Sequence, residues 1–93
     1  MENLNSVLTD ALRAALDGDQ PEIVENLGPD TDLYELVDSF VVVNILLESE
    51  SLLETKYGRY VTLADETIFD AEKSPLRKWS SWVSFVKAKH EQS

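Results

Sequence analysis

The chain has 93 residues, 43% of them hydrophobic, and a formal net charge of −10 at pH 7. This length fits one domain with a modest core, and it favours a binding module or carrier over an enzyme with a deep, walled cavity. Cysteine is absent, which excludes disulfides, thiolate metal sites and a cysteine nucleophile, and the single histidine, His90, makes a histidine triad or zinc site a poor hypothesis.

The acidic residues are concentrated in the first part of the chain. Residues 1–54 hold 13 of the 18 acids and one base, Arg13, whereas residues 55–93 hold five acids and seven bases, so the two parts carry −12 and +2. Such a charge disfavours nucleic acid and anionic lipid and favours partners with basic docking surfaces, although solubility alone also explains it. No apolar run approaches the roughly 20 residues that span a bilayer, and Met1-Glu2-Asn3 does not begin a secretory signal. We therefore expect a cytoplasmic protein that does not insert into membranes.

The first periodic segment predicts a helix over residues 4–17. Its apolar residues step by three and four along one helical face: Leu4, Val7, Leu8, Ala11, Leu12, Ala15 and Leu16. Gly18 and then Pro21 indicate its end. Residues 18–37 form a long connection, which we expect to be pinned to the core by its apolar side chains: Ile23, Val24, Leu27, Leu33, Leu36 and Val37.

A second long helix is predicted over residues 39–56. The run Val41–Val43 alone is typical of a strand, but the apolar residues that follow it fit a helical period better. Ser39 is a suitable N-cap for this helix, and Gly58 is a suitable C-terminal stop.

A short third helix is predicted within residues 65–71, after an extended segment at Val61-Thr62-Leu63. We expect Ile68 and Phe69 of this short helix to point into the core.

The last helix is predicted over residues 75–89. Ser74 and Pro75 indicate its start, because a capping serine followed by proline favours the first helical turn. Trp79 and Trp82 belong to its apolar stripe, and we assign both to the core rather than to a site. The sequence thus predicts one all-α domain over residues 1–93, with four helices, a long loop between the first two and a short third helix.

Two acidic pairs, at Asp17 and Asp30, begin like calcium-binding loops. Such loops need glycine at the sixth position and a bidentate glutamate at the twelfth. The first pair has Glu22 and Gly28 at these positions, and the second pair also lacks both required residues. We therefore predict no metal site.

The pair Asp38-Ser39 follows the long connection and opens the acid-studded second helix. In a small, acidic, four-helix chain this arrangement resembles the acyl carrier protein family, whose Asp-Ser-Leu signature places a serine at the start of the second helix for attachment of 4′-phosphopantetheine. The triplet here is Asp38-Ser39-Phe40, which is also similar to that of D-alanyl carrier proteins. The resemblance covers roughly residues 4–88 and includes Leu33-Tyr34-Glu35-Leu36, Val43, Leu46, Glu50 and Ser74-Pro75.

The resemblance implies that Ser39 carries 4′-phosphopantetheine, whose thiol holds acyl or aminoacyl groups as thioesters in lipid, polyketide or related biosynthesis. The implied partners are a phosphopantetheinyl transferase, a loading ligase and downstream synthases with basic docking surfaces. The chain itself would be a non-catalytic monomer on which other enzymes act. The partner contacts implied around Ser39 are Asp38, Phe40, Leu47, Glu48, Glu50 and Glu54.

Other interpretations of these residues stay open. A serine before an apolar run is most often only a helix cap, and acids on a helix surface are most often solvated. Core packing competes with surface exposure for Phe40 and Leu47. The family usually has glycine where this chain has Leu36, so a carrier-fold interaction domain without a prosthetic group is the second hypothesis. An independent small enzyme is the third, because convergent acid–base groups and a nucleophile–base pair are lacking.

Overall fold

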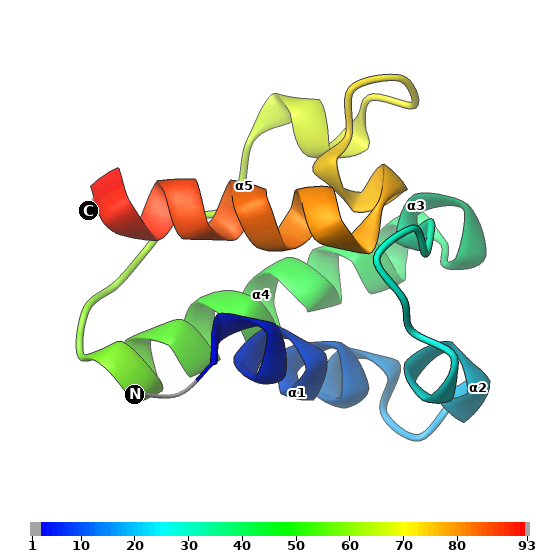
Figure 1. Ribbon diagram of the computed structural model, residues 1–93, viewed down its shortest axis with the longest axis horizontal. Coiled ribbons are helices and arrows are strands. Elements are labelled where there is room, and N and C mark those ends of the chain that lie inside the picture. The colour runs from blue at the N-terminus through cyan, green and yellow to red at the C-terminus, as the bar shows by residue number, and fades with distance from the viewer. Residues whose placement is uncertain (1–2, 93) are drawn as a thin grey trace.

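Five α-helices and two short 3₁₀ helices lie within residues 3–92, the part of the chain that the computed structural model describes (Figure 1). They are α1 (Leu4–Leu16), α2 (Pro21–Glu25), α3 (Leu33–Leu36), α4 (Ser39–Tyr57), the 3₁₀ helices η1 (Glu66–Phe69) and η2 (Pro75–Arg77), and α5 (Trp79–Gln92). No strand occurs within this range, which confirms the predicted all-α class. None of its helices has both the length and the apolar character that crossing a bilayer requires.

Helix α1 forms where the apolar spacing predicted it and ends one residue earlier than expected. The side chain of Asn3 caps its start by accepting a hydrogen bond from the Asn5 N–H at 2.9 Å. Asp17 ends the helix in a left-handed conformation, with φ at 50°. The face that α1 turns to the core is the predicted one, formed by Val7, Leu8, Ala11, Leu12, Ala15 and Leu16.

Two short helices, α2 and α3, lie in the connection that the sequence predicts as a loop over residues 18–37. Helix α2 starts at Pro21, because proline favours the first helical position. Helix α3 starts after Asp32, whose carboxylate accepts a hydrogen bond from the Glu35 N–H at 3.2 Å. Helices of five and four residues contain too little of the helical period to be recognised from an apolar pattern.

Apolar side chains pin this connection to the core, as predicted. Those that are buried or partly buried against the core are Ile23, Val24, Leu27, Leu33 and Val37. Leu36 is 48% exposed, so its assignment to the core was wrong. Helix α3 ends at Leu36, and Val37, in extended conformation, takes the inward position instead.

Helix α4 confirms the prediction of a helix over residues 39–56, including the run Val41–Val43 that alone is typical of a strand. Gly58 ends it with φ at 76°, a left-handed conformation that favours glycine. Helix α1 packs along α4 (Figure 1). The buried residues of α4 are Val42, Ile45, Leu46, Ser49, Glu50 and Leu53.

The predicted third helix is only the 3₁₀ turn η1. Ile68 is fully buried, as expected, but Phe69 is 47% exposed, so its inward orientation was wrong. A 3₁₀ helix has about three residues per turn, which sends neighbouring side chains to different sides of a single turn. One of the two apolar residues must therefore face outward.

The predicted last helix is divided in two. Lys78 lies in extended conformation between η2 and α5. The carbonyl oxygens of Thr31 and Pro29 then accept hydrogen bonds from the Trp79 and Ser80 N–H groups at 2.8 Å and 2.9 Å. The connection between α1 and α4 thus supplies hydrogen-bond acceptors for the first two backbone N–H groups of α5. Trp79 and Trp82 are both buried in the core, which confirms their assignment.

Candidate functional site

The Ser39 side chain is exposed at the first position of α4. The residue before it, Asp38, has an extended backbone with φ at −84° and ψ at 173°, and its Oδ1 accepts a hydrogen bond from the Val41 N–H at 2.9 Å. Asp38 is therefore the N-cap, and the prediction that Ser39 has this role was wrong. Because a carboxylate makes the cap, the Ser39 hydroxyl takes no part in starting the helix and faces solvent.

The start of α4 favours negative charge next to Ser39. The first backbone N–H groups of a helix have no partner within the helix, and the helix dipole is positive at this end. The first turn of α4 contains no acidic residue, and the Asp38 carboxylate is bonded to one N–H group, that of Val41. An anionic group esterified to Ser39 would meet the remaining N–H groups of this turn.

The segment before Ser39 is anchored on its inner side. Leu33 at the start of α3 is fully buried, and Val37 between α3 and Asp38 is 8% exposed. The Val37 N–H donates to the Leu33 carbonyl at 3.1 Å. Only two residues, Val37 and Asp38, separate α3 from α4. The position of α3 therefore limits where the backbone of Asp38 and Ser39 can lie.

An exposed apolar stripe continues along α4 from the site and consists of Phe40, Val43 and Leu47. Their exposed fractions are 74%, 43% and 58%. Their spacing of three and four residues places them on one helical face. The prediction of surface exposure for Phe40 and Leu47 is confirmed, and core packing of these two side chains is contradicted. Contiguous apolar surface of this kind is a common mark of an interaction site.

The three glutamates of α4 differ in their surroundings. Glu54 is exposed and Glu48 is half-buried, whereas Glu50 is buried. The Glu50 carboxylate accepts hydrogen bonds from the Leu63 N–H at 2.7 Å and from the Tyr60 hydroxyl at 3.3 Å. The interpretation of Glu50 as a solvated acid was therefore wrong, because its carboxylate holds residues 60–63 against α4, and its burial leaves little of it exposed to a partner. The negative charge of Glu50 also raises the pKa of Tyr60.

The geometry separates Ser39 from the only histidine of the chain. His90 packs against Tyr57 with a ring-centroid distance of 4.7 Å, at the far end of α4 from Ser39. A helix of this length spans roughly 27 Å at about 1.5 Å per residue, so His90 does not reach the Ser39 hydroxyl. Ser39 is placed as an accessible alcohol and not as the nucleophile of a serine–histidine pair.

Sequence reasoning missed two features near the site. One is the role of Arg77, which contacts α3 and its cap from a distant part of the chain and leaves no local sequence signal. The other is the burial of Glu50, for which a signal existed, since Glu50 lies four residues after Leu46 and three before Leu53 on the buried face of α4.

Comparisons of the chain with protein-family models, with curated proteins and with solved structures gave no match. The interpretation of the site rests on an exposed hydroxyl at a helix start, a neighbouring carboxylate cap and an apolar stripe on the same helix.

Proposed function

We propose that the chain is an acyl carrier protein that bears 4′-phosphopantetheine on Ser39. The observation that carries the proposal is the exposed Ser39 hydroxyl at the first position of α4, directly after the capping Asp38 and before the exposed Phe40. The same three residues form the triplet that resembles the attachment motif of carrier proteins. When bound, the group would supply a thiol-ended arm that holds acyl or aminoacyl groups as thioesters.

The residues at the start of α4 fit such a group. The exposed hydroxyl is accessible to a transferase that delivers the group from coenzyme A. Backbone N–H groups and the positive end of the helix dipole favour the phosphate that would be attached there. Capping by Asp38 leaves the helix start intact when the Ser39 oxygen is esterified. The role of the chain is to present this oxygen and to keep a tethered group at high effective concentration near docked enzymes.

The stripe of Phe40, Val43 and Leu47 fits the docking of partners next to Ser39. Apolar side chains at the centre of an interface supply much of its binding energy, and charges around them act mainly on encounter and orientation. The acidic first part of the chain and the exposed Glu54 would attract basic docking surfaces. A transferase, a loading ligase and downstream synthases are the partners that the proposal requires.

Intact mass tests the proposal after incubation with coenzyme A and a broad-specificity phosphopantetheinyl transferase. We expect a gain of one phosphopantetheine group, and no gain in Ser39→Ala. Ser51→Ala is the matched control, because Ser51 is another exposed serine of α4. The proposal is wrong if several competent transferases leave the mass unchanged, or if the gain persists in Ser39→Ala.

A carrier-fold interaction domain without a prosthetic group is the second candidate. The observation that favours it is Leu36, which stands where the family usually has glycine and is an exposed apolar side chain. Positive φ angles in residues 3–92 occur only at Asp17, Gln20, Gly18 and Gly58, so the backbone at Leu36 does not demand glycine. In this alternative, neither wild type nor Ser39→Ala would gain mass on incubation with the transferase, and Ser39→Ala would bind partners as wild type does.

A further inference from the structure

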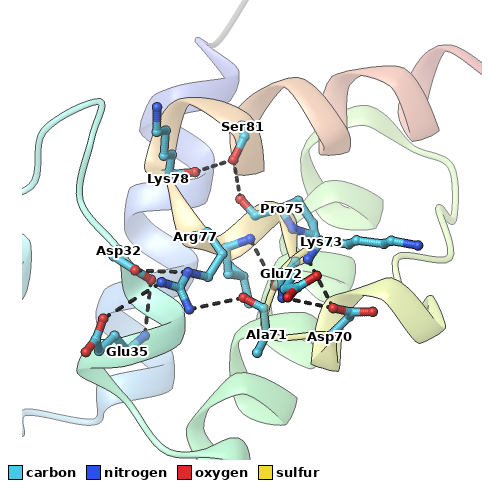
Figure 2. Close-up of polar contacts among 12 residues, drawn as sticks. Asp32, Glu35, Asp70, Ala71, Glu72, Lys73, Pro75, Arg77, Lys78 and Ser81 are labelled. Carbon is cyan, nitrogen blue, oxygen red and sulfur yellow. Dashed lines mark hydrogen bonds and ion pairs between the residues drawn. The ribbon is translucent and has the colours of Figure 1, made fainter.

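Arg77 joins the segment before Ser39 to the C-terminal part of the chain (Figure 2). Its Nε lies 3.0 Å from Asp32 Oδ2 and its Nη2 lies 3.9 Å from Glu35 Oε2. Its Nη1 donates a hydrogen bond to the Ala71 carbonyl at 3.1 Å. The guanidinium therefore connects two acids of the α3 region with the backbone between η1 and η2. We call this set of contacts the Arg77 clasp.

The clasp acts on a helix that needs external support. Helix α3 is a single turn, and so short a helix has little stability of its own. Its cap is Asp32, so the same carboxylate that starts the helix is also held by Arg77. The Tyr34 hydroxyl donates to the Phe69 carbonyl at 2.9 Å, and the Tyr34 ring lies 5.6 Å from the Arg77 guanidinium carbon. These contacts all tie α3 to the segment that contains η1 and η2.

We propose that Arg77 is a positioning residue for the attachment site, an inference that rests on the proposed function of Ser39. The clasp fixes α3, and only Val37 and Asp38 lie between α3 and Ser39. The placement of Val37 determines where the Asp38 carboxylate meets the Val41 N–H, and hence how well the first turn of α4 is ordered. Arg77 thereby sets the presentation of the Ser39 hydroxyl to a transferase without touching it.

The clasp requires arginine rather than any cation. Its Nη1 donates a hydrogen bond to a backbone carbonyl, while its Nε and Nη2 lie within ion-pair distance of two different carboxylates. The planar guanidinium supplies several N–H donors in fixed directions, whereas the single ammonium of lysine at the end of a flexible chain does not hold them together. Arg77→Lys keeps the charge and should restore only part of the function.

The test compares Arg77→Gln and Arg77→Lys with Arg13→Gln. Arg13 forms an exposed pair with Asp10 on α1, so its substitution makes the same charge change away from the site. For Arg77→Gln we expect kcat/KM of Ser39 modification to fall about tenfold, because a misplacement of about 1 Å can cost about a hundredfold and the loss of a remote contact should shift the hydroxyl by less. Arg77→Lys should lie between wild type and Arg77→Gln, and Arg13→Gln should match wild type. Equal kcat/KM for Arg77→Gln and Arg13→Gln would overturn the proposal.

Amide hydrogen exchange gives a readout that does not depend on modification. In Arg77→Gln the Val41 N–H should exchange faster, since its bond to Asp38 loosens, while the Leu53 N–H in the centre of the core keeps its protection. Unchanged exchange at Val41 would contradict the clasp even if Ser39 is modified. If wild type itself is not modified, the proposed function fails, and the exchange result still decides whether Arg77 orders this turn.

A second substitution separates the clasp from a general loss of stability. Asp32→Asn keeps an oxygen that can cap α3 but removes the charge that Arg77 holds. If the two residues act as one unit, Arg77→Gln should slow modification little further in the Asp32→Asn background. Independent effects that multiply in the double variant would show that Arg77 acts in another way.

Discussion

At the level of single residues, Asp38 and Ser39 have different roles at the start of α4. The carboxylate of Asp38 caps α4, whereas the exposed hydroxyl of Ser39 does not take part in the cap. A serine that capped its own helix would lose a stabilising hydrogen bond on modification. Under the carrier proposal, this division would allow the Ser39 oxygen to be esterified while the helix start is preserved.

This division predicts different effects of two alanine substitutions on stability. Asp38→Ala should lower the free energy of unfolding by about 1 kcal/mol, which is typical for the loss of an N-cap. Ser39→Ala should change it by no more than about 0.5 kcal/mol, as expected for an exposed side chain without a structural role. Urea unfolding measures both values. A larger loss in Ser39→Ala than in Asp38→Ala would show that Ser39 is the cap after all.

The pair of Glu50 and Tyr60 predicts a pH dependence in alkaline solution. The charge of Glu50 raises the pKa of Tyr60 in the folded chain above the value of about 10 for an unperturbed tyrosine. The stability that this contact contributes is fully present below the unfolded pKa, and it is lost as the pH rises through the folded pKa. Absorbance titration of tyrosinate should show Tyr60 ionising at a lower pH in Glu50→Gln. An unchanged Tyr60 titration in that variant would contradict the contact.

At the scale of elements, the long helices were predictable and the short ones were not. The apolar period over α1 and α4 extends over several turns, so the sequence alone indicates both helices and nearly all of their ends. The division between η2 and α5 depends on carbonyl groups of Pro29 and Thr31, which are distant in sequence. The Arg77 clasp depends on the fold in the same way. No local pattern contains such information.

Part of the candidate site could be predicted from the sequence, namely the exposure of the stripe on α4. The family resemblance indicated the surface position of Phe40 and Leu47, and the spacing of the stripe explains why Val43 lies with them. The buried position of Glu50 follows from its register with Leu46 on the same helix, but its partner in the backbone at Leu63 required the fold.

The stripe predicts a defect in partner binding that is separate from stability. Leu47→Gln should raise the KM of the transferase reaction several-fold to about tenfold and leave kcat nearly unchanged, because truncating a central interface residue often costs more than 1 kcal/mol of binding. Ser51→Gln on the same helix should leave KM unchanged. Thermal unfolding of both variants should match wild type, since both side chains are exposed. A fall in kcat with constant KM would place Leu47 outside the docking surface.

For the molecule as a whole, the charge distribution and the size fit the proposed carrier, which partner enzymes would have to approach closely. The radius of gyration of 12.1 Å is close to the ~12 Å expected of a compact domain of this length. The acidic excess lies in residues 1–54, which include all of α1, α2 and α3 and most of α4. A partner of the proposed carrier that is drawn to this part of the chain would meet the stripe and Ser39 on the same helix.

The attachment of phosphopantetheine to Ser39 is best tested by peptide fragmentation in a mass spectrometer, on the full chain purified after co-expression with a phosphopantetheinyl transferase. We expect one phosphopantetheine group per chain, attached to the fragment ion that contains Ser39 and to no other serine. A chain that stays unmodified beside a transferase proven active on another carrier, or a group found at a different residue, would contradict it.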